Sequence, residues 1–109
     1  MSKKNARAGG KYGGGHTTVI PVAGEIADIA HRCSSVTKIS PGFIKSGLPT
    51  TKGVKRVKIT ETESGLLLSV RGNISHQELR VYADDVALAK ACITEGAISA
   101  GFVVSLNEN

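Results

Sequence analysis

Apolar residues recur at helical spacing in two parts of this chain. In the segment 22–33 they fall on one face of a helix, at Val22, Ile26, Ile29 and Cys33. Pro21 suits the first turn of that helix, where its missing N–H is not needed. Asp84 is a suitable N-cap for a second helix, which we expect to run to about Glu95 before Gly96 ends it. The pattern therefore predicts two helices with the middle of the chain between them.

Between and after these helices, apolar residues alternate with polar ones. The alternation predicts three strands, at residues 54–61, 66–71 and 77–83. Further extended segments are expected at residues 16–20, 36–39 and 98–106, whereas residues 45–53 are rich in Gly, Pro, Ser and Thr and predict a loop. Such alternation is typical of an antiparallel sheet with one face in water. The predicted fold class is α+β: an antiparallel sheet of three to five strands with two helices packed on one face, in the order (β)αββββαβ.

Composition divides the 109 residues into a tail and one domain. Residues 1–15 contain five glycines and four basic residues, too little apolar surface to offset the entropy of ordering, so we expect a flexible basic tail. Residues 16–109 are long enough for a single α+β domain with an aliphatic core. The tail is interpreted either as a solubilising segment or as a mobile arm for a phosphate backbone. The basic residues of that arm are Lys3, Lys4, Arg7 and Lys11.

Basic and acidic residues are concentrated in opposite halves of the chain. Residues 1–60 carry eleven Lys or Arg against two acids, whereas residues 61–109 carry three against seven. The halves therefore have net charges of +9 and −4, within a total of +5. Because local concentration of positive charge is the electrostatic signature of nucleic-acid binding, the first half favours a polyanionic partner.

The strand pattern predicts where part of this positive charge gathers. If the apolar positions face the helices, the opposite sheet face carries Arg56, Lys58, Arg71, Arg80 and Tyr82. Guanidinium groups match phosphate geometry, and a tyrosine ring can stack on an unpaired base. The neighbouring loop adds Lys45 and Lys52. The alternative is an ordinary solvated face whose basic residues pair with Glu61 and Glu78 across strands.

Metal ligands and catalytic groups are sparse. His16 and His76 are the best candidate pair of metal ligands, because both lie at predicted strand ends or loops, although zinc prefers three or four ligands. The alternative is two unrelated surface histidines. Cys33 and Cys92 are expected in the core. Because no nucleophile elbow and no phosphate-binding loop is present, we do not expect an enzyme or a resident cofactor beyond a possible divalent metal.

Several short motifs resemble a prokaryotic family of unknown function catalogued as predicted metal-binding proteins. They span residues 16–83: His16-Thr17-Thr18, residues 36–44 (VTKISPGFI), residues 56–60 (RVKIT), Arg71-Gly72 and residues 77–81 (QELRV). The resemblance implies metal binding, with His16 the matching residue that is able to ligate. The matching basic residues Arg56, Lys58 and Arg71 suit an anion-binding role at least as well.

The favoured function is a small nucleic-acid-binding protein, with RNA expected rather than DNA. The alternatives are a metal-binding protein and a protein-interaction or self-assembly module, in which oppositely charged halves of two copies meet as a homo-oligomer. No apolar run approaches the ~20 residues that span a bilayer, so no membrane partner is expected. Two cysteines 59 positions apart indicate no disulfide framework and favour a reduced, cytoplasmic protein.

Overall fold

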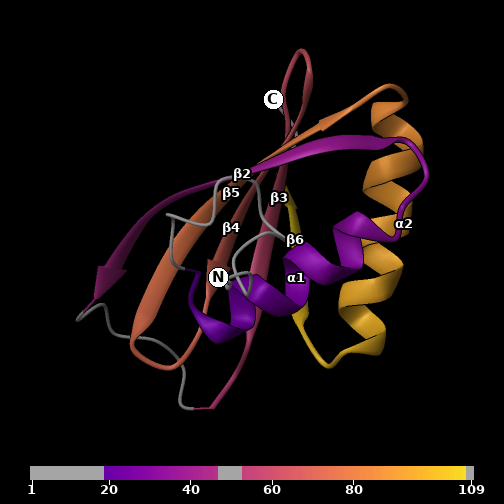
Figure 1. Ribbon diagram of the computed structural model, residues 1–109. Coiled ribbons are helices and arrows are strands. Elements are labelled where there is room, and N and C mark those ends of the chain that lie inside the picture. Colours follow the sequence, from indigo (N-terminus) through magenta and orange to yellow (C-terminus); the bar gives the residue numbers. More distant parts are fainter. Residues whose placement is uncertain (1–18, 47–52, 108–109) are drawn as a thin grey trace, which may run out of the picture.

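The computed structural model describes residues 19–46 and 53–107, and these form two helices and one five-stranded sheet (Figure 1). The elements in chain order are α1 (Pro21–His31), β2 (Val36–Ser46), β3 (Arg56–Glu61), β4 (Gly65–Arg71), β5 (Ser75–Ala83), α2 (Val86–Ser99) and β6 (Val103–Asn107). The strands lie side by side in the order β2-β5-β4-β3-β6. This arrangement confirms the predicted α+β class and the predicted order of elements after the first strand.

The sheet is mixed, whereas the alternation predicted an antiparallel one. The pairs β2–β5, β5–β4 and β4–β3 are antiparallel, but β6 runs parallel to β3. The reason is the connection from β5 to β6, in which α2 crosses the sheet and returns the chain in the same direction. Periodicity shows that a segment is a strand with one buried face, but it does not show the direction of its partner.

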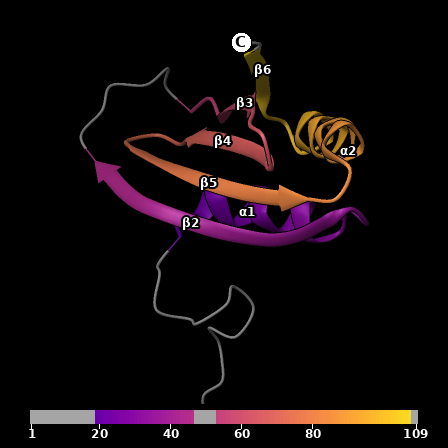
Figure 2. The same ribbon diagram turned by 90° about the horizontal axis from the view of Figure 1, so that it is seen from above.

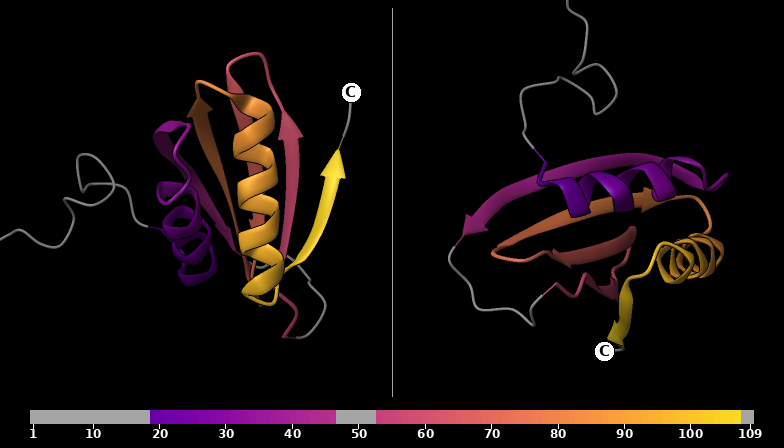
Figure 3. Two further views of the ribbon diagram at one scale, coloured as in Figure 1. Left: turned by 90° about the vertical axis from the view of Figure 1, so that its right-hand side faces the viewer. Right: turned by 90° about the horizontal axis from the view of Figure 1, so that it is seen from below.

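Both helices cover the same face of the sheet, and the core lies between the two layers (Figures 2 and 3). The sheet side of this core consists of the apolar half of each alternating pattern. On β3, β4 and β5 the buried residues facing the helices include Val57, Ile59, Leu66, Leu68, Val70, Leu79 and Val81. Burial of these side chains contributes about 1.5–3 kcal/mol each. The same alternation leaves the second face of the sheet open, with the polar half of each strand on it.

Gln77 is a fully buried polar residue on the helix side of β5. Its Oε1 accepts a hydrogen bond from the backbone N–H of Ile20 at 3.0 Å, and its Nε2 donates to the carbonyl of Gly42 at 2.7 Å. These bonds tie the start of α1 to β2. Ile20 is the N-cap of α1, so the part of the predicted strand 16–20 that the structure describes is not a strand; residues 16–18 lie outside the described residues.

Strand β2 is longer than predicted. It continues through Pro41 and Gly42, beyond the predicted extended segment 36–39, and reaches Ser46, inside the predicted loop 45–53. The chain accommodates the proline with an irregularity: the pairing register with β5 shifts between Pro41 and Ile44. Such a bulge is possible because β2 is an edge strand, where a missing N–H and an extra residue disturb only one neighbour.

The second helix extends beyond the predicted end. Gly96 does not stop α2 but lies within it, and a side chain there would collide with Ile29 of α1. This glycine therefore allows close contact between the helices rather than ending one of them. The N-cap is Asp85 instead of Asp84, since the Asp85 carboxylate accepts from the N–H of Leu88 at 3.0 Å. The last strand is correspondingly shorter than the predicted 98–106.

Cys33 and Cys92 form a disulfide bond, which the sequence analysis did not expect. Cys33 lies just after α1 and Cys92 lies within α2, with their Cα atoms 6.1 Å apart. Both had been assigned to the core individually, but packing the two helices side by side brings the sulfurs together. The argument from cysteine usage for a reduced compartment therefore loses its basis, and cytoplasmic localisation stays a prediction.

Candidate nucleic-acid interface

The register of the sheet brings four basic side chains into one row across its open face. Lys45 of β2 pairs with His76 of β5, His76 with Arg71 of β4, and Arg71 with Arg56 of β3. Neighbouring strands are about 4.8 Å apart, so each cationic or titratable group has another beside it. Like charges directly opposite each other destabilise a sheet by roughly 0.2–1 kcal/mol per pair. Within the row, Arg71 and Arg56 are the directly opposed pair of permanent cations, so an anion bound there would relieve their repulsion.

The other predicted basic residues lie on the same open face. Lys58 follows Arg56 two residues along β3, and Arg80 and Tyr82 alternate with the buried Leu79 and Val81 on β5. The structure adds Lys38, which pairs with Tyr82 and whose Nζ lies 5.6 Å from the centre of the tyrosine ring. We name this surface the open basic face; its cations are Lys38, Lys45, Arg56, Lys58, Arg71 and Arg80.

Few acids oppose this charge. Glu61, one of the two expected cross-strand partners, instead forms a salt bridge of 3.2 Å with Lys90 of α2. Glu25 of α1 likewise binds Lys55 at 3.0 Å, at the edge of the helix layer. Glu78 is the acid that the described strands place on the open basic face, between His76 and Arg80 on β5. The solvated-face interpretation, which needed both Glu61 and Glu78 as partners, is wrong for Glu61.

His76 occupies the middle of the basic row and is almost completely buried, with 8% of its surface exposed. Its Nε2 lies within hydrogen-bond distance of the Ser69 hydroxyl. Burial lowers the pKa of His76 below its usual value of 6.5, and the nearby charges of Arg71 and Lys45 lower it further, against the opposing effect of Glu78. At neutral pH this imidazole is therefore uncharged, and an anion bound to the row would raise its pKa.

Phe43 is an aromatic residue that the sequence analysis passed over. It lies in β2 between Pro41 and Ile44, where the register with β5 shifts, and 94% of its surface is exposed. A side chain this exposed does not contribute to the core. The signal in the sequence is Pro41-Gly42 immediately before an aromatic residue, which fits a bulge in an edge strand.

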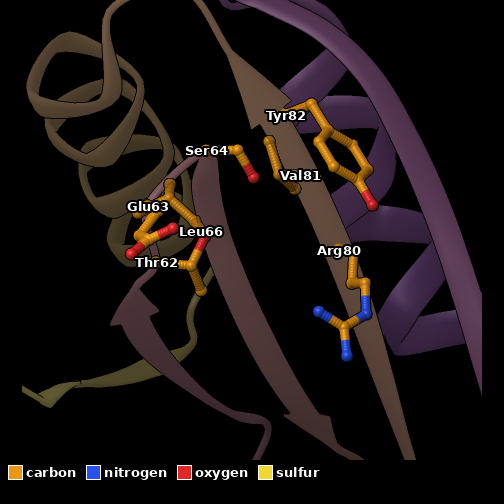
Figure 4. A pocket seen from close by; sticks show the side chains of 7 residues that line it. All are labelled: Thr62, Glu63, Ser64, Leu66, Arg80, Val81 and Tyr82. Carbon is orange, nitrogen blue, oxygen red and sulfur yellow. The ribbon is translucent and has the colours of Figure 1, made fainter.

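A pocket of about 330 Å³ lies at the end of the open basic face, between the β3–β4 turn and β5 (Figure 4). Arg80 and Tyr82 line it from β5, and Thr62, Glu63 and Ser64 line it from the turn, while Leu66 and Val81 complete the lining. The turn is held in place because the Thr62 hydroxyl accepts a hydrogen bond from the N–H of Gly65 at 3.1 Å. Positive, aromatic and hydrogen-bonding groups thus meet around one small cavity.

The predicted metal pair is not assembled in the part of the chain that the structure describes. His16 lies outside the described residues, and no group of three or more His, Cys, Asp or Glu side chains within them could hold a metal ion. The charged neighbours of His76 are Arg71, Lys45 and Glu78, and the two cations among them disfavour a metal ion at this ring. The predicted arm residues Lys3, Lys4, Arg7 and Lys11, and the loop residue Lys52, also lie outside the described residues.

Large apolar side chains are exposed on the opposite side of the molecule, at Leu88 and Ile98 of α2 and Leu106 of β6. Nothing in the structure shows what covers them, so self-assembly stays a prediction. Neither described helix is long and apolar enough to cross a membrane.

The chain matches the model of a family described as "Predicted metal-binding protein (DUF2103)" over residues 7–95. That match covers most of the 109 residues, so the chain belongs to this family. The resemblance noted from the sequence motifs is therefore confirmed, and it extends beyond residues 16–83. No curated protein and no solved structure matches the chain significantly.

Proposed function

We propose that the open basic face binds single-stranded nucleic acid, with RNA as the expected ligand. The observation that supports this most directly is the row formed by Lys45, His76, Arg71 and Arg56 across four neighbouring strands. Arg71 and Arg56 lie directly opposite each other in this row, and opposed like charges do not stabilise a sheet. A phosphate backbone laid along the row would supply the counter-charge and release its own counterions, which contributes favourably to binding.

The aromatic residues favour a single strand over a duplex. Tyr82 lies on the open basic face, and Phe43 lies at its edge with no contact that buries it. Each can stack on an unpaired base, which contributes about 1–3 kcal/mol per base. Bases inside a duplex are already stacked and do not offer this contact. RNA is the expected ligand because sequence-specific recognition of RNA mostly uses single-stranded loops and ends.

Binding of fluorescently labelled oligonucleotides tests this function. We expect a ten-residue single-stranded RNA to bind more tightly than its duplex, with an affinity that falls steeply between 50 and 200 mM salt. The Phe43→Ala variant should weaken binding of the single strand by about 5- to 150-fold, the equivalent of one lost stacking contact. Ile98→Ala is the matched control, because Ile98 is also an exposed apolar side chain but lies on α2, away from the open basic face. Absence of any salt-dependent binding would refute the proposal.

The mobile arm expected from residues 1–15 is tested in the same assay. Changing Lys3, Lys4, Arg7 and Lys11 together to Gln removes its charge while keeping the full chain. If the folded domain carries the site, this variant binds more weakly but still prefers single strands. Complete loss of binding would assign the activity to the tail instead.

Metal binding is the second candidate, and the family description is what favours it. The described residues contribute His76 alone to the predicted pair, and that ring is already hydrogen-bonded to Ser69 and has the cations of Arg71 and Lys45 as well as the Glu78 carboxylate near it. Titration with zinc while the histidine ring signals are followed by NMR tests this candidate. Shifts of both His16 and His76 would support it, and unchanged rings would reject it.

A further inference from the structure

The pocket at the end of the open basic face has a chemistry that phosphate binding does not explain. Among its lining residues is Glu63, which adds a second carboxylate, besides Glu78, to a surface that presents six cations. A carboxylate repels phosphate and can only accept hydrogen bonds when ionised. A group that donates hydrogen bonds would pair with Glu63, and its volume would have to suit a cavity of about 330 Å³. That volume lies at the small end of ligand sites, which range over roughly 300–1,000 Å³.

The neighbours of Tyr82 differ on its two sides. On the β2 side, Lys38 lies over the ring at 5.6 Å from its centre. On the β4 side the residue opposite Tyr82 is Gly65, which has no side chain. A side chain could not be placed there, because a Cβ on Gly65 would overlap the Val81 carbonyl. Gly65 therefore places no side chain against the ring, and Tyr82 lines the pocket together with Arg80 and the turn that carries Glu63.

We propose that this pocket holds one unpaired guanine of the bound strand. The inference rests on the proposed function and names the base that the same face selects. The guanine would stack on Tyr82, and its N1–H and N2–H groups would donate to the Glu63 carboxylate. Of the four RNA bases, guanine alone presents two adjacent donors on its pairing edge, which match the two oxygens of a carboxylate. Arg80 would contact a phosphate or the acceptor atoms O6 and N7 of the base.

The test compares labelled ten-residue oligouridines by fluorescence anisotropy at low salt, using the full chain. One oligonucleotide is all uridine, one has a single central guanosine, and one has inosine in its place. A bidentate contact to a base discriminates by about 5- to 150-fold, so the guanosine strand should bind tighter than all-uridine by that factor. Inosine lacks the N2 amino group and should lose most of the gain.

Two variants separate this pocket from general charge effects. Glu63→Gln should abolish the preference for guanosine while leaving the affinity for all-uridine RNA and its salt dependence unchanged or slightly stronger. Glu61→Gln is the matched control. It removes the same charge two positions before Glu63, but the Glu61 side chain faces Lys90 and not the pocket. The preference of this variant for guanosine should equal that of the wild type.

The outcomes distinguish the two proposals. Salt-dependent binding with equal affinity for the guanosine and uridine strands, or a preference that survives Glu63→Gln, would overturn the guanine pocket and leave the proposed function standing. No salt-dependent binding of any strand would overturn both.

Discussion

Removing two charges from the open basic face should change the salt dependence of RNA binding by a calculable amount. The perturbation is Lys58→Gln combined with Arg71→Gln. It removes two positive charges and keeps a polar side chain at each position. Both residues are exposed, and they belong to the adjacent strands β3 and β4. Replacing Arg71 also removes a like-charge contact with Arg56, so the variant should fold at least as well as the wild type.

The magnitude follows from the number of cations that the face presents. Each phosphate contact on a single strand contributes about 0.7 to the slope of log affinity against log salt. Contacts from all six cations give a slope of about −4, which corresponds to a loss of about 300-fold in affinity between 50 and 200 mM salt. With four contacts the slope falls to about −2.8 and the loss to about 50-fold.

Fluorescence anisotropy with single-stranded RNA at four salt concentrations measures these slopes. The control is Arg32→Gln combined with Lys90→Gln, one arginine and one lysine as in the test pair but located after α1 and within α2. Its net charge is identical, so a general charge effect would lower both slopes equally. Equal slopes in the two double variants would refute the argument that the open face makes the phosphate contacts.

Four further predictions concern the fold that supports this face. Gly65→Ala should lower the free energy of unfolding by about 2–3 kcal/mol in urea denaturation, because its Cβ would overlap a β5 carbonyl. Gln77→Leu should cost about 2–4 kcal/mol by leaving a buried N–H and C=O unpaired, and an unchanged denaturation midpoint would contradict the role given to this side chain. Reduction of the Cys33–Cys92 bond should lower stability by about 4 kcal/mol on the chain-entropy model for a separation of 59 residues, with a doubly substituted Ala variant insensitive to reductant. Because the pKa of His76 is lowered on folding, the unfolded chain binds the proton at a higher pH than the folded protein does, so stability should fall as the pH drops below about 6.5. NMR titration of the His76 ring should show a pKa that rises on addition of RNA.

The sequence was sufficient for those features that depend on local periodicity. Alternation on β3, β4 and β5 placed Val57 and Leu79 inside, and therefore Arg56 and Arg80 outside on a common face. That inference succeeded because a strand has two faces and the apolar one must be buried. The family motifs could likewise be recognised from short runs of residues.

The remaining features depend on contacts between distant segments. Gly96 has the sequence signature of a helix end, yet it lies within α2 because Ile29 of α1 packs against it. The bond between Cys33 and Cys92 requires the two helices to lie side by side, which no local pattern indicates. Phe43 projects from a bulge that becomes visible only once β2 is paired with β5. Tertiary packing decided each of these against the local signal.

The most direct test of the central claim is a map of amide chemical shifts in the full-length protein during titration with a single-stranded RNA. The account predicts that the largest changes cluster on the open basic face, at Lys45, Arg56, Lys58, Arg71, Arg80 and Tyr82, and leave the outer surface of α2 unaffected. Changes confined to residues 1–15, or centred on α2 and β6, would contradict it.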